Sequence, residues 1–227
     1  MSILTCWVTP ARALVGVDTL ALRADGSAGE FGKMYVLPQA AAVFAGRGGA
    51  DFLTVVYVTL QAQGGKFDDI AERLPALLNT LMRALSAQFA ALKDDAGAAR
   101  LQLQQLVFVG WSDRLARMIC HAFTQETVAG GIAHEVIDST SSSPYFIAPW
   151  DKSFARLCFP QKVSEGMQPI ELGILARAQV AWLAKVTPDD VSGGRLILAE
   201  MSRGSVRTWE ECDLQDGWHL VKGGLVA

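Results

Sequence analysis

The opening stretch "MSILTCWVTPARALVGVD" (residues 1–18) decides the fold that this sequence predicts. Residues 2–8 and 12–18 are rich in apolar and β-branched side chains, and the breaker pair "TP" separates them. This pattern predicts two short strands that begin almost at the first residue. Because Ser2 stands directly behind Met1, removal of Met1 by a methionine aminopeptidase would leave a hydroxyl and a free α-amine on one residue.

The composition predicts a globular protein with a substantial core. Of its 227 residues, 51% are hydrophobic and 19% are charged, and the formal net charge is −3. This balance does not indicate a nucleic-acid partner or an anionic membrane surface. The longest uncharged stretch, between Asp51 and Lys66, is too short to span a membrane. The start also lacks the basic region of a signal peptide, so we expect a cytoplasmic protein.

The potential metal ligands are scattered along the chain. The cysteines are Cys6, Cys120, Cys158 and Cys212, and the histidines are His121, His134 and His219. None of the cysteines forms a CxxC pair, and no ligand spacing typical of a metal site is present. We therefore expect buried apolar thiols, no metal and no cofactor.

Breaker-rich segments divide the chain into strands and helices. Strands are predicted over 2–8, 12–18, 33–37, 40–45, 103–110, 115–123, 132–138 and 144–148, with a closing hairpin over 192–211 that turns at "SRGS". Helices are predicted from a cap at Asp51 to about Gln63, over about 67–91 with Pro75 near its first turn or at a kink, and over 167–186.

The helices cluster in sequence instead of alternating with every strand, which argues against a doubly wound parallel sheet. We expect an α+β fold in which helices flank two antiparallel sheets, a four-layer αββα sandwich. No repeat or low-complexity linker divides the chain, so residues 1–227 are expected to form a single domain.

A free N-terminal serine suits nucleophilic catalysis. Its α-amine has an unperturbed pKa of about 7.7–8.0, so it can act as a general base for the weakly acidic hydroxyl. A lysine nearby would polarise the hydroxyl, an aspartate would hold that lysine, and backbone N–H groups would face the oxyanion. The candidates are Asp18 in "GVDT", Lys33 in "GKMYVL", the glycine stretch "FAGRGGAD", and Asp189 and Ser192 in "TPDDVSGGRL".

Each of these residues also has an ordinary structural role open to it. Asp18 could start a turn, and Lys33 could be a charge that protects an edge strand from aggregation. Asp189 and Ser192 suit a loop. The glycine stretch lacks the Gly-Lys-Ser/Thr ending of a phosphate-binding loop. The tryptophans Trp150, Trp182, Trp209 and Trp218 are expected to pack in the core or at an interface.

Taken in order, the motifs resemble the proteasome β-subunit family, including its HslV-type bacterial relatives. Ser2 stands where the family has an N-terminal Thr, and the pair "DT" follows with Asp18 16 positions later. Lys33 arrives one residue early, "AGRGGAD" is one residue longer than the family's glycine stretch, and "DDVSGG" matches its late motif. The resemblance covers about residues 2–210. This chain departs from the family in its serine nucleophile and in Leu20, where the family often has Arg.

The resemblance implies an N-terminal-nucleophile hydrolase and a role for each candidate. Ser2 would be nucleophile and base, Lys33 would polarise it, Asp18 would orient Lys33, and the Gly46 N–H would lie in the oxyanion hole. Asp189 and Ser192 would bond to the N-terminus. A serine of the mid-chain turn "DSTSSSPY", Ser141 or Ser142, would support the site.

The function implied is that of a proteasome-type peptidase subunit. It would cleave peptide bonds through an acyl-enzyme ester on Ser2 once Met1 is removed. The resemblance further implies stacked rings of identical subunits, a peptide or unfolded protein as substrate, and an unfoldase as a possible partner. Two alternatives stay open: an inert shell or interaction subunit with the same fold, and an amidase that acts on a small substrate.

Overall fold

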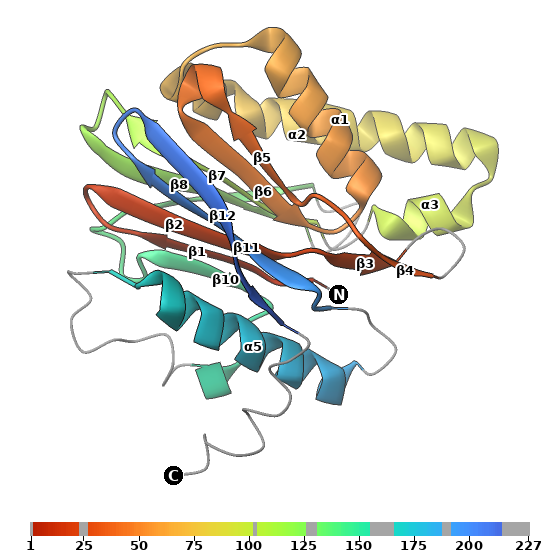
Figure 1. Cartoon of the computed structure of the whole chain (residues 1–227). Helices are drawn as coiled ribbons and strands as arrows, with labels where there is room; N and C mark the ends of the chain where they lie inside the picture. Colours follow the sequence, from red (N-terminus) through yellow and green to blue (C-terminus); the bar gives the residue numbers. More distant parts are fainter. Residues whose placement is uncertain are drawn as a thin grey trace.

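Antiparallel sheets form the framework of the molecule (Figure 1). The computed structural model describes residues 2–22, 27–101, 104–125, 131–154, 166–187 and 192–214. One five-stranded sheet has the order β10-β1-β2-β11-β12, a second has the order β5-β6-β7-β8-β9, and β3 and β4 form a small hairpin. All the strand pairs described are antiparallel.

The strands are short, and most lie close to their predicted positions. In the first sheet they are β1 (Leu4–Val8), β2 (Arg12–Asp18), β10 (Tyr145–Ala148), β11 (Arg195–Ser202) and β12 (Ser205–Asp213). In the second they are β5 (Met34–Leu37), β6 (Ala42–Arg47), β7 (Gln105–Ser112), β8 (Arg117–Thr124) and β9 (Ala133–Ile137). The hairpin consists of β3 (Leu20–Leu22) and β4 (Ala28–Glu30).

Helices lie on the outer faces of the two sheets (Figure 1). They are α1 (Ala50–Gln63), α2 (Phe67–Leu92), α3 (Asp95–Arg100) and α5 (Pro169–Val186), with 3-10 turns η1 (Pro38–Ala40) and η3 (Lys152–Phe154). In Figure 1, α1 and α2 cover the sheet that contains β5 and β6, and α5 lies against the sheet that contains β1 and β2. The predicted α+β class with antiparallel sheets is confirmed.

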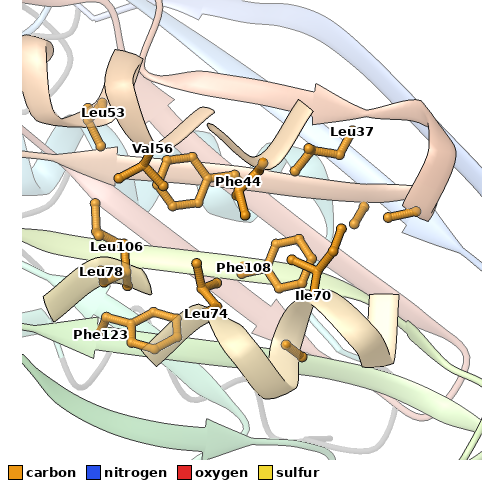
Figure 2. Close-up of a cluster of buried hydrophobic side chains, with 14 of the residues drawn as sticks. Leu37, Phe44, Leu53, Val56, Ile70, Leu74, Leu78, Leu106, Phe108 and Phe123 are labelled. Atoms are coloured by element: carbon orange, nitrogen blue, oxygen red, sulfur yellow. The ribbon is translucent and has the colours of Figure 1, made fainter. Parts of the chain in front are cut away.

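Three buried apolar clusters hold these elements together. Figure 2 shows the first, where side chains of α1 and α2 such as Leu53 and Leu74 meet strand residues such as Phe44 and Phe108. A second cluster joins strands of both five-stranded sheets, and a third joins α5 to β1, β2 and β11. Burial of one large apolar side chain stabilises a fold by about 1.5–3 kcal/mol. These contacts therefore fix how the sheets and helices lie relative to one another.

Strand β6 shows how the sequence serves two clusters at once. Successive side chains of a strand point to opposite faces. Phe44 packs among the helices, whereas Val43 and Ala45 face the other sheet. Because both faces are buried, this strand reads as a continuous apolar run rather than as an alternating one.

The structure corrects several local predictions. Asp51 does not cap α1: the N-cap is Gly49, without a side-chain cap, and Asp51 lies in the first turn, where its charge favours the helix dipole. Pro75 lies inside α2 beyond its first turn. The segment before Lys33, expected to be a loop, contains the strand β4, and the stretch after Asp94 forms α3, because the Asp94 side chain accepts from the Gly97 N–H.

Candidate functional site

The first described residues of the chain meet the end of β2. Leu4 is opposite Val17 in the antiparallel pairing of β1 with β2, so the residues that precede Leu4 lie beside Asp18. The Ile3 N–H donates to Asp18 Oδ1 at 3.0 Å. This bond fixes the backbone directly after Ser2, whose side chain is partly buried.

Lys33 joins the two sheets at this end of the molecule. It directly precedes β5 and is only 6% exposed. Its Nζ donates to Ser2 Oγ at 2.7 Å, to Asp18 Oδ1 at 2.9 Å and to the carbonyl of Leu20. Three acceptors thus use all three donors of an ammonium group. Lys33 is held as a cation against the Ser2 hydroxyl, where it favours the deprotonated form of that hydroxyl.

The Asp18 carboxylate lies in the interior with both oxygens hydrogen-bonded. Oδ1 accepts from Ile3 N–H and Lys33 Nζ, and Oδ2 accepts from the Gly193 N–H at 3.0 Å. Burial raises the pKa of the Asp18 carboxyl, and the charge of Lys33 opposes that rise. Burial likewise lowers the pKa of the Lys33 amine, against the effect of Asp18, and the charge of Arg47 lowers it further. Burial and the opposite charge of the partner thus act in opposite directions on the pKa of each group, and burial has the larger effect on both.

Backbone groups of two neighbouring segments complete the surroundings of Lys33. The Leu20 N–H donates to the carbonyl of Gly193 at 3.1 Å, and the Arg195 N–H donates to Thr19 Oγ1 at 2.9 Å. Gly194 has a φ of +71°, and a Cβ there would lie 2.6 Å from Thr19 Oγ1, so this position requires glycine. These bonds lock the start of the β3–β4 hairpin to the start of β11.

Sequence reasoning missed the groups in this network that act through the backbone. The Leu20 carbonyl and the Gly193 N–H contact Lys33 and Asp18 directly, yet neither depends on a distinctive side chain. The glycine pair in "SGGRL" was the available signal, because a positive φ at Gly194 needs a residue without Cβ.

The glycine stretch after β6 differs from its expected use. The Gly46 N–H donates to the Lys33 carbonyl at 2.9 Å, so it is engaged in the pairing of β5 with β6. Gly48 follows two residues later, just beyond the end of β6, and no acceptor for its N–H is found in the described part of the chain.

The other predicted site residues lie in different places. Asp189 is outside the described residues, and Ser192 is partly buried next to Gly193. Ser141 Oγ accepts from the Asp138 N–H at 3.0 Å within its own turn, and Ser142 is exposed.

The structure does not bring Ser141 and Ser142 to Ser2. Strand β10 is antiparallel to β1, with Tyr145 opposite Trp7, so the turn that precedes β10 lies beyond the far end of β1. The prediction failed because the composition of a serine-rich segment indicates a turn but not its position in the fold. That position depends on the order of the strands.

Among the residues that the structure describes, no three His, Cys, Asp or Glu side chains gather as they would around a metal ion. None of the described helices is long and apolar enough to cross a membrane.

Comparisons with known proteins support the fold but identify no family. No protein-family model matches the chain, and no curated protein is significantly similar to it. Among solved structures, Anbu (ancestral beta-subunit) from Yersinia bercovieri matches with a TM-score of 0.63 and 13% identity over 97% of this chain and 95% of that one. Anbu from Hyphomicrobium sp. strain MC1 matches with a TM-score of 0.64 and 11% identity, over 98% of this chain and 94% of that one.

These matches correct the resemblance drawn from the motifs. The similar structures are Anbu proteins, whose proteasome-like fold of the N-terminal-nucleophile type belongs to a different family from the proteasome β-subunits and HslV. At 11–13% identity the likeness extends to the fold alone. The motifs therefore indicated a similar type of fold but the wrong family.

Proposed function

We propose that this chain is an N-terminal-nucleophile hydrolase that cleaves peptide bonds through an ester on Ser2, once Met1 has been removed. One observation carries the proposal: a buried lysine donates to the hydroxyl of the second residue at 2.7 Å, with a buried aspartate behind it. An isolated structural ion pair would need no hydroxyl at this position. A lysine that serves catalysis does, because its charge stabilises the developing alkoxide.

The reaction would proceed in two steps. The α-amine of Ser2 takes the proton of Oγ, and Oγ attacks the peptide carbonyl to form a tetrahedral oxyanion. Collapse of this intermediate breaks the C–N bond, and the amine fragment leaves with the proton that the α-amine had taken. A water molecule, deprotonated by the same amine, then hydrolyses the ester and frees Oγ. Lys33 stays an ammonium throughout, since its three donors already have acceptors.

We assign the oxyanion-hole donor to the Gly48 N–H instead of the Gly46 N–H. The Gly46 N–H is engaged with the Lys33 carbonyl. Gly48 lies two residues further along the chain, just beyond the end of β6, and no acceptor for its N–H is found among the described residues. Asp189 and Ser192 remain proposed as partners of the free N-terminus. The neighbour of Ser192, Gly193, bonds to Asp18, which supports a place for that loop beside the site.

The finer architecture is also a proposal. Three apolar clusters, each between two different sets of elements, support a four-layer αββα sandwich in one domain over residues 1–227. Exposed apolar side chains on the helices, among them Val58 on α1 and Ile170 on α5, support self-association into rings. Sedimentation at micromolar concentration tests this, and a species of the chain mass, 24.4 kDa, would contradict it.

A covalent probe tests the proposed function. A peptide β-lactone should add its acyl group to Ser2, and mass spectrometry of the N-terminal peptide should find it there and find Met1 absent. Ser2→Ala should abolish labelling and peptidase turnover, and Ser2→Thr should keep both. Ser142→Ala is the matched control, because Ser142 is exposed and lies at the other end of β1.

Two outcomes would overturn the proposal. Turnover that survives Ser2→Ala would remove Ser2 from the mechanism. Quantitative retention of Met1 in protein from its native cells, with no adduct at Ser2, would favour the inert subunit.

A further inference from the structure

Gln104 is a buried polar side chain beside the glycine turn that follows β6. It is 1% exposed and directly precedes β7. The Gly49 N–H donates to Gln104 Oε1 at 3.1 Å. On its backbone side, the Gln104 carbonyl accepts from the Gln125 N–H at 2.8 Å. The backbone of Gln104 is therefore bonded to the residue that follows β8, while its side chain reaches the glycine turn that follows β6.

The turn and the glutamine side chain also fit each other sterically. Gly48 has a φ of +132°, a region that residues with a side chain rarely adopt. A Cβ on Gly48 would lie 2.3 Å from Gln104 Oε1 and 2.6 Å from its Cδ. The amide of Gln104 thus occupies the space that a side chain at residue 48 would need.

We propose that Gln104 is a positioning residue for the hydrolytic reaction. It holds the Gly49 amide and packs against Gly48, and so fixes the direction in which the Gly48 N–H points at the developing oxyanion. This inference rests on the proposed function, because it needs the Gly48 amide to serve as the oxyanion donor. Gln104 acts only through the turn and does not touch the reacting atoms.

Small changes in such a turn should have a large effect on rate. An oxyanion-hole donor works only about 2.7–3.1 Å from the oxygen of the intermediate, and loss of one donor lowers kcat by about 100- to 1000-fold. Loss of the hydrogen bond from the Gly49 N–H to Gln104 would leave the Gly48 N–H present but change the direction in which it points. The expected loss for Gln104 is therefore about 10- to 100-fold in kcat with little change in KM, because the ground-state carbonyl gains less from the donor.

Two substitutions at this position separate hydrogen bonding from packing. Gln104→Met keeps the length and approximate volume of the side chain but has no strong acceptor for the Gly49 N–H. Gln104→Glu keeps an acceptor oxygen at the same place in either protonation state. We expect Gln104→Met to show the full loss of kcat and Gln104→Glu to recover most of it.

Gln179 provides a matched control. It too is a fully buried glutamine with two hydrogen bonds, from Thr5 Oγ1 to its Oε1 at 3.2 Å and from its Nε2 to the Pro149 carbonyl at 3.1 Å. It lies on α5, against the other face of the sheet that contains β1. Gln179→Met should destabilise the protein about as much as Gln104→Met yet leave kcat near that of the wild type.

The experiment measures kcat and KM on a peptide substrate, together with amide hydrogen exchange at Gly49. In Gln104→Met the Gly49 amide should exchange at least 10-fold faster and kcat should fall, and Gln104→Glu should restore both. A wild-type kcat in Gln104→Met, unchanged exchange at Gly49, or an equal loss of kcat in Gln179→Met would each overturn the inference. If Ser2→Ala keeps its turnover, the proposed function fails instead, and the exchange rates still report whether Gln104 holds the turn.

Discussion

Two pairs of titratable side chains in this molecule lie in different surroundings: the Lys33–Asp18 pair is buried, whereas His121 is partly buried and His134 is exposed. Lys33 and Asp18 lie 2.9 Å apart between the two five-stranded sheets, and His121 and His134 lie 3.0 Å apart, from Nδ1 to Nε2, on the neighbouring strands β8 and β9. Burial is the largest influence on the pKa of every member of both pairs. The partner differs as well, because it carries the opposite charge in one pair and would carry the same charge in the other.

The histidine pair behaves as part of the apolar surface. Burial, followed by the neighbouring His134, lowers the pKa of His121 to about 4. The ring of His121 lies 5.7 Å from that of Phe67, and the ring of His134 lies 4.7 Å from that of Phe123, measured between centroids. Both imidazoles are therefore neutral at pH 7, so the pair needs no counter-ion.

The ion pair differs, because the charge of each member opposes the effect of burial on the pKa of the other. Replacement of a buried ion pair by apolar side chains is often neutral or stabilising, so its presence is weak evidence for a stabilising role. Here the cation also donates to Ser2 Oγ. The two pairs therefore differ in that the buried cation of one contacts a hydroxyl, whereas the other pair is neutral at pH 7.

The largest effect is expected from Asp18→Ala. This change leaves the Lys33 charge buried without its partner, which lowers the free energy of unfolding by about 3–5 kcal/mol. Peptidase turnover should fall by on the order of 1000-fold or more, because Lys33 loses the group that orients it towards Ser2. Urea unfolding and steady-state kinetics measure the two losses. Asp113→Ala, which removes an exposed carboxylate, should change neither.

A double replacement should separate stability from activity. In Asp18→Leu with Lys33→Met, both charges are gone and the site is filled with apolar atoms. The free energy of unfolding should recover most of the loss seen in Asp18→Ala, about 2–4 kcal/mol, while turnover stays absent. A double variant as unstable as Asp18→Ala would mean that the ion pair holds the sheets together. The contrast with the histidine pair would then reflect stability and would not support a catalytic role for Lys33.

The sequence alone predicted two of the residues that the structure places beside Ser2. Asp18 and Lys33 were found from their places at a strand end and a strand start, and the structure brings both to Ser2. Short apolar strands and the amphipathic helix α2 were equally visible, because burial imposes a local period on them.

What the sequence could not predict depends on contacts between distant segments. The engagement of the Gly46 amide follows from the register of β5 with β6, and the remote place of Ser141 follows from the order β10-β1-β2. The role of Gln104 rests on a contact across 55 positions of the chain. Neither register nor strand order has a local signal, so these features appear only in three dimensions.

A smaller effect is expected from acid acting on the histidine pair. The pKa of His121 is lowered to about 4 in the folded protein, whereas an unfolded histidine has a pKa of about 6.5. Between these values the unfolded chain binds more protons, so stability falls as the pH drops from about 6.5 towards 4 and is regained above it. With allowance for partial exposure, the loss is on the order of 1–2 kcal/mol.

Unfolding measured in urea at pH 7 and at pH 4.5 tests this expectation. His121→Phe keeps an aromatic ring beside Phe67 and removes the titrating group, so this variant should lose less stability between the two pH values. Equal pH dependence in wild type and variant would place the acid sensitivity elsewhere and would weaken the comparison of the two pairs.

The smallest effect on stability is expected from replacement of Arg195, an exposed residue whose ion pairs serve as the reference for the buried pair. Arg195 is 45% exposed and pairs with Glu30, and its Nη1 also lies 2.9 Å from Glu210 Oε2. Water solvates these charges in the folded and unfolded states alike, so the contacts add little to stability despite their good geometry. Arg195→Ala should shift the thermal midpoint by no more than about 2 °C, and added salt should remove even that difference. A shift as large as that of Asp18→Ala would show that geometry, and not burial, governs the ion pairs of this fold. The burial of the Lys33–Asp18 pair would then not distinguish it from the exposed ion pairs, because any pair with good geometry would stabilise the fold to the same extent.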